Sequence, residues 1–376
     1  MLSNDDCIFY FLFYMRLLII TQIVDRTDRE LGFFHEWLVA FAEKFERITV
    51  IGLKVGEYEL PANVQVLSLG KPALSGPATG WEHAGLRVQY VTRFYRYIWK
   101  YRHDYDAVYI HQNQEYATLG GLLWRMLGKR VTLWRNHYAG SWRTDLAAFF
   151  CHKVFCTSKY SYTAKYTQTV IMPVGVSDRM FYPHDDIERI PRSILSLGRI
   201  APSKKLEQLI EAFSLLIQRG VAFTASIVGS VQPEYEEYLA DLKAKASVMC
   251  ARESCSITFL PGAAYREIPE IYSAHDIFVN LSKSGMLDKT MFEAMLCETL
   301  VVSCNKDLRG EIRDQFLFEE DNPADLADRL EAMLSLAPDD RLRAAAGLRA
   351  YAAREHALSQ LVLRLHEELS DSVLHK

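Results

Sequence analysis

The sequence predicts an α/β fold with two domains, each built on a parallel β-sheet with crossover helices. The first observation is length, because 376 residues exceed what one hydrophobic core ordinarily serves. The second is that short β-branched runs alternate with amphipathic helical stretches, which is the pattern of strand–helix–strand units. The third is a single interruption of this alternation at residues 172–186, whose Pro, Gly and Asp residues indicate a linker.

The first alternation fills the half of the chain before the linker. Its β-branched runs predict strands at 17–24, 48–53, 64–69, 107–111, 131–134 and 154–157. Its amphipathic stretches predict helices at 31–44, 86–102 and 117–127, the last closed by Gly128 as a C-terminal cap. Ligands of such sheets bind beyond the carboxyl ends of the strands, so the residues that follow each strand are the candidates for function.

The second alternation begins after the linker. It predicts strands at 193–197, 223–228, 257–260, 277–281 and 300–303, with helices at 206–219, 233–247, 268–274 and 290–296. Three more helices, at 323–336, 339–353 and 358–369, end the chain. We therefore expect an N-terminal extension at 1–14, domains at 15–175 and 191–355, a linker at 176–190, and a C-terminal helix at 356–376 that crosses back to the first domain.

Composition excludes several classes of protein. The chain is 49% hydrophobic and 24% charged, with 12 Pro and 19 Gly, which excludes disordered, collagen-like and coiled-coil proteins. Its seven Cys form no Cys-x-x-Cys pair, so we expect neither a zinc site nor any other bound metal, and we predict reduced thiols in a cytoplasmic protein.

The first residues are strongly apolar but do not predict a membrane span. The run at 7–15 is interrupted by Arg16 and is shorter than the roughly 20 residues that cross a bilayer. Asp5 and Asp6 precede it where a secretory signal would carry basic residues. We expect the folded domain to begin at Met15, with a short segment that dips into a membrane as the alternative.

Charge is divided unevenly along the chain. Residues 83–179 carry 14 basic and 5 acidic side chains, although the whole chain has a net charge of −4. On a helix over 87–106, Arg93, Arg96 and Lys100 form a basic stripe beside an apolar one. This pattern favours an anionic membrane surface or a lipid-phosphate acceptor. A crossover helix with a solvated charged face is the alternative, and no motif supports nucleic-acid binding.

Two stretches of the second half suit a nucleotide. In SILSLGRIAPSKKLEQLIEAF (193–213), a strand ends at Gly198, and Arg199 and Lys204 precede a helix whose N-terminus would favour a diphosphate. The alternative is that both are solvated surface charges. In LSKSGMLDKTMFEAMLCETLVVSC (281–304), a small-residue loop leads to a helix carrying Glu293, which suits ribose hydroxyls. Here the alternative is that Asp288 only caps the helix and Glu293 is solvated.

With their spacing, these stretches resemble the donor half of the retaining family 4 glycosyltransferases, also called glycosyl transferases group 1. The family pattern is Gly-Arg-Leu with Lys five residues after the Arg, then Ser-x-x-Glu-Gly-Phe-Gly-Leu-x-x-x-Glu-Ala-Met. Here it stands as Gly198-Arg199-Ile200 with Lys204, then Ser282, Gly285 to Lys289, and Glu293-Ala294-Met295. The resemblance covers nearly the whole chain from Met15 and implies the GT-B fold, two Rossmann-like βαβ domains that face across a central cleft.

The resemblance implies roles for individual residues. Arg199 and Lys204 would bind the donor diphosphate and take part in catalysis, and Glu293 would hold the ribose. The loop would place backbone amides near the transferred sugar and phosphate, and it consists of Met286, Leu287, Asp288, Lys289 and Thr290. This chain departs from the family pattern at one position. It has Gly285 where the family has the first glutamate of its Glu-x7-Glu pair. We expect Asp288 to contact sugar hydroxyls in its place, with Lys289 near the diphosphate.

The first half supplies further candidates at its strand ends. His111 ends the predicted strand 107–111, before a helix, and His137 comes after the strand 131–134. The resemblance implies that His111 lies beside the donor sugar and its departing phosphate, and the family often has a second histidine in the cleft at the position of His137. The alternative is structural, because a lone histidine at a strand end commonly serves only as a hydrogen-bonding residue. In the loop 22–37, Gly32 is the candidate for a glycine that lets the backbone approach the phosphate.

The function that follows is transfer of a sugar from a nucleotide-diphosphate sugar to a hydroxyl acceptor, with retention at the anomeric carbon and without a metal or other cofactor. The basic stretch suggests a lipid-linked or cell-surface glycan precursor as the acceptor, with the protein peripheral at the inner face of a membrane. Two alternatives stay open, a degenerate glycosyltransferase that serves as a binding or scaffold subunit, and a nucleotide-sugar epimerase of the same fold. The sequence does not identify the base, the sugar, the acceptor or the oligomeric state.

Overall fold

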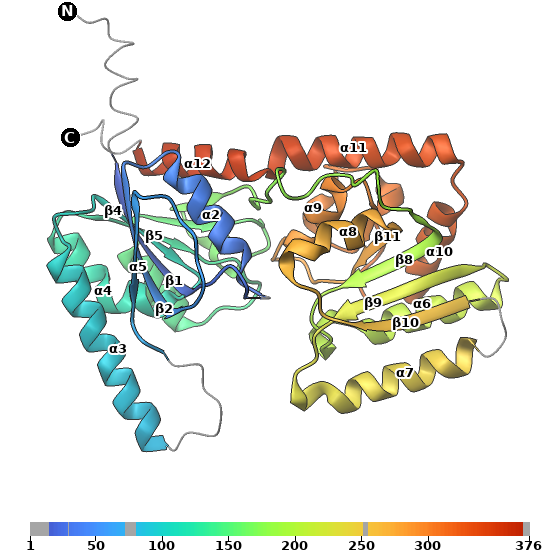
Figure 1. The fold of residues 1–376 in the computed structure, drawn as a ribbon, viewed down its shortest axis with the longest axis horizontal. Helices are drawn as coiled ribbons and strands as arrows, with labels where there is room; N and C mark the ends of the chain where they lie inside the picture. Colours follow the sequence, from blue (N-terminus) through green and yellow to red (C-terminus); the bar gives the residue numbers. More distant parts are fainter. Residues whose placement is uncertain (1–14, 29, 72–79, 251–254, 371–376) are drawn as a thin grey trace, which may run out of the picture. The chain divides into compact units, whose positions relative to one another are not determined.

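The computed structural model describes residues 15–28, 30–71, 80–250 and 255–370, so the predicted extension at 1–14 lies outside the described residues. The chain divides into two compact units (Figure 1). The N-terminal unit holds the chain up to Met172 together with the segment from Leu361, and the C-terminal unit holds Pro173–Gln360. Both units are α/β, as the alternation of strand and helix patterns predicts.

The N-terminal unit is built on a parallel sheet of seven strands in the order β3-β2-β1-β4-β5-β6-β7. β1 and β4 at its centre are buried and apolar, as expected of strands covered on both faces. The strands are β1 Arg16–Val24, β2 Arg47–Val55, β3 Val64–Ser68, β4 Ala107–His111, β5 Arg130–Trp134, β6 Lys153–Cys156 and β7 Thr169–Ile171.

Helices cover both faces of this sheet. On one face α3 (Gly80–Lys100), α4 (Gln114–Met126) and α5 (Trp142–Phe150) enclose a core that includes Phe94, Trp124 and Ala147. α2 (Phe33–Ala42) packs through Phe34 and Trp37 against His111 and Trp134, whose side chains point to the opposite face.

The C-terminal helix returns to the N-terminal unit, as predicted. In α12 (Leu358–Ser370), Glu368 pairs with Lys153 at 2.5 Å, and the carbonyl of Leu369 accepts a hydrogen bond from Arg130. The ring of His366 lies 5.4 Å from that of Phe45. α12 therefore completes the core of the unit in which the chain begins.

The C-terminal unit is built on a parallel sheet of five strands in the order β10-β9-β8-β11-β12. The strands are β8 Ile190–Leu197, β9 Phe223–Gly229, β10 Cys255–Pro261, β11 His275–Asn280 and β12 Leu300–Ser303. The helices are α6 Leu206–Gln218, α7 Glu236–Cys250, α8 Ile268–Ser273, α9 Lys289–Leu296, α10 Pro323–Leu334 and α11 Pro338–His356. One apolar core, centred on β8 and β11, joins them.

The sequence pattern misses one α-helix and one strand. α5 is nine residues long, and its exposed Trp142 and Phe149 obscure the apolar periodicity that marks a buried helix face. β7 has three residues and lies at the sheet edge next to β6, where the register of its neighbour rather than its own composition decides its conformation. Both lie outside the predicted site.

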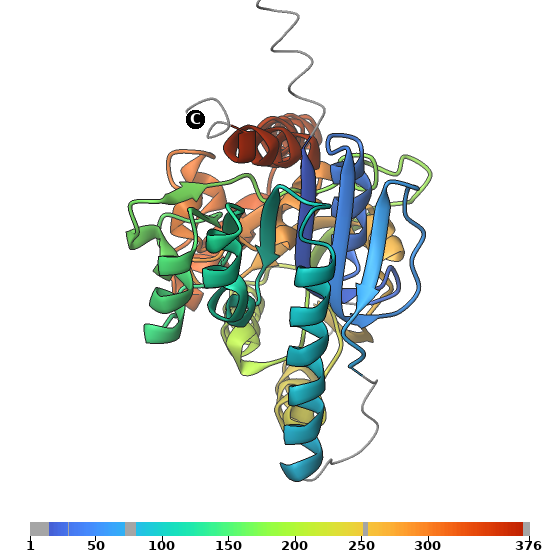
Figure 2. The same cartoon turned by 90° about the vertical axis from the view of Figure 1, so that its left-hand side faces the viewer.

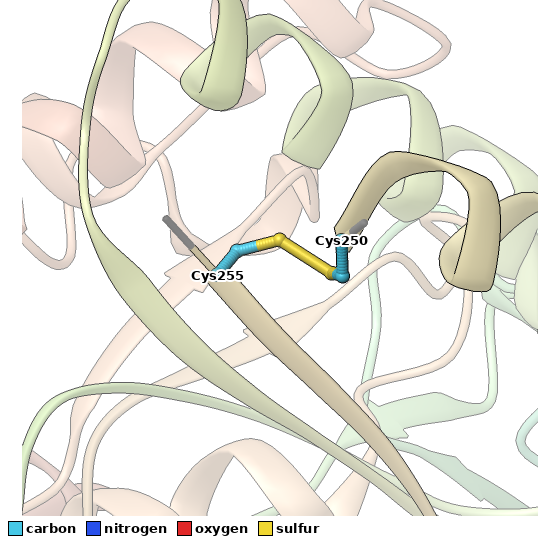
Figure 3. Close-up of a disulfide and its surroundings, with 2 residues drawn as sticks. All are labelled: Cys250 and Cys255. Atoms are coloured by element: carbon cyan, nitrogen blue, oxygen red, sulfur yellow. A yellow bond between two sulfur atoms is a disulfide. The ribbon is translucent and has the colours of Figure 1, made fainter. Parts of the chain in front are cut away.

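The structure corrects the expectation of reduced thiols at one pair. Cys250 ends α7 and Cys255 begins β10, and their Cα atoms lie 5.5 Å apart in a disulfide (Figure 3). The other cysteines with a described position, Cys151, Cys156, Cys297 and Cys304, are buried and not in disulfides.

Within the described ranges, no helix has the length and apolar character needed to span a bilayer. No group of three or more His, Cys, Asp or Glu side chains suited to a metal ion occurs among these residues either.

Candidate active site

The candidate site of the C-terminal unit lies at the carboxyl edge of its sheet. β8 and β11 are neighbours in this sheet, so the loops that follow them leave the same edge side by side. The first loop carries Arg199 and reaches Lys204 in a short 3-10 turn before α6, and the second reaches Asp288 at the start of α9. The sheet order therefore brings together two motifs whose key residues lie 84 positions apart.

An ion pair between Lys204 and Asp288 joins the two loops. Lys204 Nζ lies 2.6 Å from Asp288 Oδ2 and 3.1 Å from Ser282 Oγ. The Ser282 hydroxyl donates to the same carboxylate oxygen at 3.0 Å, and the Asn280 amide at 3.5 Å. The two charged side chains are 25% and 15% exposed, so water screens the pair only weakly. The structure thus places two predicted site residues in direct contact.

Asp288 also caps α9. Its Oδ1 accepts a hydrogen bond from the Thr290 amide at 3.3 Å, so the predicted alternative of a helix cap is present, while Oδ2 binds Lys204. Burial by itself would raise the pKa of Asp288, but the charge of Lys204 and the hydrogen bonds it receives hold that pKa well below its usual range. The carboxyl group is therefore ionised at neutral pH.

A pocket opens beside this ion pair. Its polar lining comes from both loops and includes Gly198, Arg199, Lys204, Asn280 and Ser282. The close approach of the strand ends depends on Gly229, because a Cβ there would lie 1.9 Å from the Gly198 carbonyl oxygen. Arg199 and Lys204 place two cationic side chains in the lining of this pocket, which suits a phosphate group.

The N-terminus of α6 differs from the sequence prediction. Its first amide, that of Leu206, donates to Tyr238 Oη at 3.1 Å. Lys205, the N-cap residue, has a φ of 52° and binds Glu320 and Asp321 at 3.2 and 2.5 Å. A side chain of the unit thus binds the first amide of this helix, while Arg199 and Lys204 lie in the lining of the pocket.

Lys289 and Glu293 form a second charged group, one turn apart on α9. Glu293 is 3% exposed and accepts hydrogen bonds from Tyr272 at 3.2 Å and from Tyr265 at 3.4 Å. Lys289 Nζ donates to the Gly175 carbonyl at 2.8 Å. Burial raises the pKa of Glu293 to about 7, against the opposing charge of Lys289, and burial likewise lowers the pKa of Lys289.

The loop before α9 has a conformation that favours glycine. Gly285, at the position of the family's first glutamate, has a φ of +99°, a region that other residues adopt only at a cost. Met286 offers its carbonyl to the Asn305 amide at 3.1 Å, and Leu287 is buried in the apolar core. Thr290 Oγ1 accepts from the Asn280 amide at 3.3 Å. Of these loop residues, Leu287 therefore serves the core.

In the N-terminal unit, His111 is the last residue of β4, at the strand end as predicted, and it is buried. Its ring stacks on Phe34 with centroids 4.2 Å apart, and its Nδ1 lies 3.3 Å from Thr21 Oγ1. The exposed fraction is 1%. These contacts are those of a structural histidine, the alternative that the sequence left open, and the catalytic role of His111 stays a prediction.

His137 and Gly32 lie in loops at the same edge of the N-terminal sheet. His137 Nδ1 accepts from the Ala139 amide at 2.9 Å, and its ring stacks on that of Tyr138. Gly32 is the residue before α2, and a Cβ there would lie 2.4 Å from the Asp28 carbonyl oxygen. Gly32 thus permits a tight turn of its own loop, and its contact with a phosphate stays a prediction.

Sequence reasoning missed three side chains that hold the site together. Asn280 ends β11, and its amide reaches both Asp288 and Thr290. Tyr272 and Tyr265 bind Glu293 from the segment before β11. Asn280 carries a signal, because it is a polar residue that ends an apolar strand. The two tyrosines have no such sequence signal, because only the fold brings them close to α9.

Comparison with known proteins relates the C-terminal unit to a family. Residues 191–336 match the family model described as Glycosyl transferases group 1. The mannosylfructose-phosphate synthase of Agrobacterium fabrum is 28% identical over 142 residues, which are 35% of this chain and 31% of that protein. The match therefore spans about a third of this relative. The family model therefore matches most of the C-terminal unit and less than half of the whole chain.

Solved structures show the same fold over nearly the whole chain. A sucrose-phosphate synthase from Thermosynechococcus elongatus has a TM-score of 0.76 at 15% identity, covering 96% of this chain and 100% of that one. HepE of Anabaena, in a complex with UDP-glucose, has a TM-score of 0.71 at 16% identity over the same shares. Such low identity shows the fold alone, which is GT-B with two Rossmann-like units, as predicted.

Proposed function

We propose that the protein is a glycosyltransferase that moves a sugar from a nucleotide-diphosphate sugar to a hydroxyl acceptor. The observation that carries this proposal is the pocket at the carboxyl ends of β8 and β11, where Arg199 lies beside the Lys204–Asp288 ion pair. A cationic pocket at this edge is where open α/β sheets hold phosphate-bearing ligands. The family match of residues 191–336 and the UDP-glucose complex of HepE support a nucleotide sugar as the donor.

The chemistry that we propose proceeds with retention. The bond from the anomeric carbon to the diphosphate oxygen breaks, the acceptor oxygen bonds to the same face, and the acceptor proton passes to the departing phosphate. Arg199 and Lys204 stabilise the negative charge on that phosphate. Asp288 is ion-paired and caps a helix, so we assign it to sugar hydroxyls rather than to nucleophilic attack.

Arg199 and Lys204 can take the role of a metal ion in stabilising a departing diphosphate, so we propose that the reaction needs no metal. Turnover should persist after dialysis against EDTA, measured as release of nucleoside diphosphate. Activity that disappears on chelation and returns with added Mg²⁺ would contradict this.

The acceptor is proposed to be a lipid-linked or cell-surface glycan precursor, made at the cytoplasmic side of a membrane. Two named relatives, the mannosylfructose-phosphate and sucrose-phosphate synthases, form products that are phosphorylated sugars. Small sugar phosphates therefore belong in the same acceptor screen. Incorporation of labelled sugar into extracted lipid, compared with incorporation into soluble sugar phosphates, decides between these acceptors.

A donor screen tests the proposed activity. UDP, GDP and ADP, each with its sugars, are added to the purified chain, and melting temperature and released nucleoside diphosphate are measured. We expect one nucleotide to raise the melting temperature and its sugar to be turned over. In Lys204→Met both effects should be lost, whereas Lys245→Met, which removes an exposed pair with Asp241, should behave like the unmodified chain.

The screen also separates the alternatives. A scaffold descended from a glycosyltransferase, for which Gly285 in place of glutamate is the argument, would bind a nucleotide and release nothing. An epimerase would change the sugar while no acceptor is consumed. Binding of none of the nucleotides would contradict the proposal itself.

A further inference from the structure

The outer face of α3, α4 and α5 exposes large apolar side chains. Trp99 is 53% exposed, Met126 77% and Phe149 72%. Isolated exposed apolar residues are ordinary on protein surfaces, but a group of them indicates an interaction site. The group, here called the three-helix face, consists of Val88, Tyr95, Trp99, Leu122, Met126, Leu146 and Phe149.

Contacts between the helices make this face continuous. Tyr95 on α3 donates its hydroxyl proton to the Leu119 carbonyl of α4 at 2.8 Å. Arg125 on α4 reaches the Phe149 carbonyl of α5 at 3.5 Å. α3 lies along the face of the sheet that is turned toward the viewer in Figure 2. The exposed residues are spaced by three, four or seven positions along each helix and so share one side of it.

Trp99, Met126 and Phe149 lie in the last turns of their helices, whereas Val88 and Trp142 are exposed nearer the opposite ends. α3 ends at Lys100 shortly before β4, α4 ends at Met126 before β5, and α5 ends at Phe150 before β6. These strands are parallel, so the three helix ends lie at the amino edge of the sheet. His111 and His137 belong to the opposite, carboxyl edge.

The chain also enters the fold at this amino edge. β1 begins at Arg16, and Leu17 pairs with Ala107 at the start of β4.

Cations accompany the apolar side chains. Arg96, Lys100 and Arg125 are exposed on α3 and α4, and the Arg102 guanidinium stacks over the Trp99 ring at 4.5 Å. The loop between α3 and β4 carries two acidic residues, Asp104 and Asp106. Asp106 forms an ion pair with Arg16 at 2.8 Å. Asp145 on α5 is bound by Lys165 at 2.8 Å, and Glu115 lies at the far end of α4.

Arg93 belongs to the basic stripe that the sequence predicts, but its side chain binds the end of a neighbouring strand. Its guanidinium donates to the Leu69 carbonyl at 2.8 Å and fills the space beside Gly70. It therefore holds the end of β3, and it is not counted in the three-helix face.

We propose that the three-helix face docks on the surface of an anionic lipid bilayer, with Trp99, Met126 and Phe149 in the interfacial layer and Arg96, Lys100 and Arg125 on lipid phosphates. Tryptophan and other aromatic rings favour the boundary between headgroups and acyl chains, and basic residues near an anionic surface add attraction. A second copy of the chain fits less well, because a symmetric contact places this basic patch against itself.

Binding to vesicles tests the proposal without donor or acceptor. The purified full chain is sedimented with phosphatidylcholine vesicles that contain about 40% phosphatidylglycerol. We expect at least tenfold weaker binding to vesicles of phosphatidylcholine alone, and binding that falls as salt is raised. The variant Trp99→Ser/Phe149→Ser and the variant Arg96→Glu/Lys100→Glu should each lose at least tenfold in partitioning. Failure of the unmodified chain to bind the anionic vesicles would overturn the proposal.

A matched control carries the same kind of change elsewhere. Val248 is 79% exposed and Leu342 60%, both in the C-terminal unit, and Val248→Ser/Leu342→Ser should bind as the unmodified chain does. Equal binding by the Trp99→Ser/Phe149→Ser variant and this control would overturn the proposal. So would a chain starting at Met15 that no longer binds, because the apolar run would then be the anchor.

Two more measurements separate membrane binding from dimerisation and from nucleotide binding. Light scattering at several concentrations shows whether the chain dimerises, and a dimer that Trp99→Ser/Phe149→Ser abolishes would assign the face to a second copy instead. The nucleotide-induced rise in melting temperature is measured on every variant. This rise should be the same in every variant as in the unmodified chain. Loss of vesicle binding can therefore be distinguished from failure of the proposed enzymatic function.

Discussion

At the scale of single residues, Asp288 decides how much positive charge the pocket offers. Its carboxylate lies 2.6 Å from Lys204 Nζ, so a diphosphate must share that ammonium with it. In Asp288→Asn the cap on α9 can be kept, because asparagine is as good a cap, while the charge is lost. We expect UDP to bind about 3- to 10-fold more tightly, a gain of about 1 kcal/mol, measured by titration calorimetry.

Turnover should move in the opposite direction in the same variant. If Asp288 contacts sugar hydroxyls, Asp288→Asn should release UDP from its sugar at least tenfold more slowly while UDP itself binds more tightly. A circular dichroism spectrum checks the fold. Unchanged affinity together with unchanged turnover would show that Asp288 acts only as a helix cap.

Glu293 gives a pH dependence with a defined sign. Burial raises its pKa to about 7, whereas an ordinary glutamate titrates near 4.5, so below about pH 7 a growing share of the folded protein carries the neutral acid. A ribose hydroxyl donates best to a carboxylate. UDP-glucose affinity should therefore rise as the pH increases from 5.5 to 8, and the donor phosphates keep their charge throughout.

Replacing the carboxylate provides the control for this pH dependence. Glu293→Gln should bind UDP-glucose weakly, and the rise of affinity with pH over the same interval should be absent, measured by calorimetry. An equally steep profile in the variant would assign the pH dependence to another group.

At the scale of elements, the loop between β11 and α9 determines what the missing glutamate means. Gly285 has a φ of +99°, so a side chain there is strained by about 1–2 kcal/mol. We expect Gly285→Glu to lower the free energy of unfolding by that amount, measured in urea, and not to raise turnover. Restored high activity would show that the loop readily adopts the family's conformation.

A second glycine serves as the matched control. Gly347 lies within α11, and a Cβ there would meet nothing within 4 Å. Gly347→Ala should stabilise the protein by about 0.5–1 kcal/mol, because glycine is a poor helix former.

At the scale of the whole molecule, α12 ties the end of the chain to the unit in which it begins. Leu365 on this helix is fully buried, while Leu363 is 45% exposed. Leu365→Ala should cost about 2–4 kcal/mol in the unfolding of the N-terminal unit, and Leu363→Ala about 0.5 kcal/mol or less. Urea unfolding measures both. Equal effects would show that the returning helix adds little to that core.

The sequence predicts most of the fold because its signals are local. The two alternations of strand and helix, the linker and the C-terminal helix follow from periodicity within about 20 residues. α5 is missed because its exposed Trp142 and Phe149 disrupt that periodicity. Within the site, Arg199, Lys204 and Asp288 are recognisable from their place after strands, whereas the contact of Tyr272 with Glu293 leaves no trace in the local pattern.

By itself, the sequence determines two α/β units and the candidate residues at their strand ends, since both depend on short-range pattern. The tertiary structure alone decides that Asp288 neutralises Lys204, that burial and tyrosine hydroxyls surround Glu293, and that Trp99, Met126 and Phe149 share one edge. These properties arise from residues distant in sequence, which come together only when strand order and helix direction are fixed.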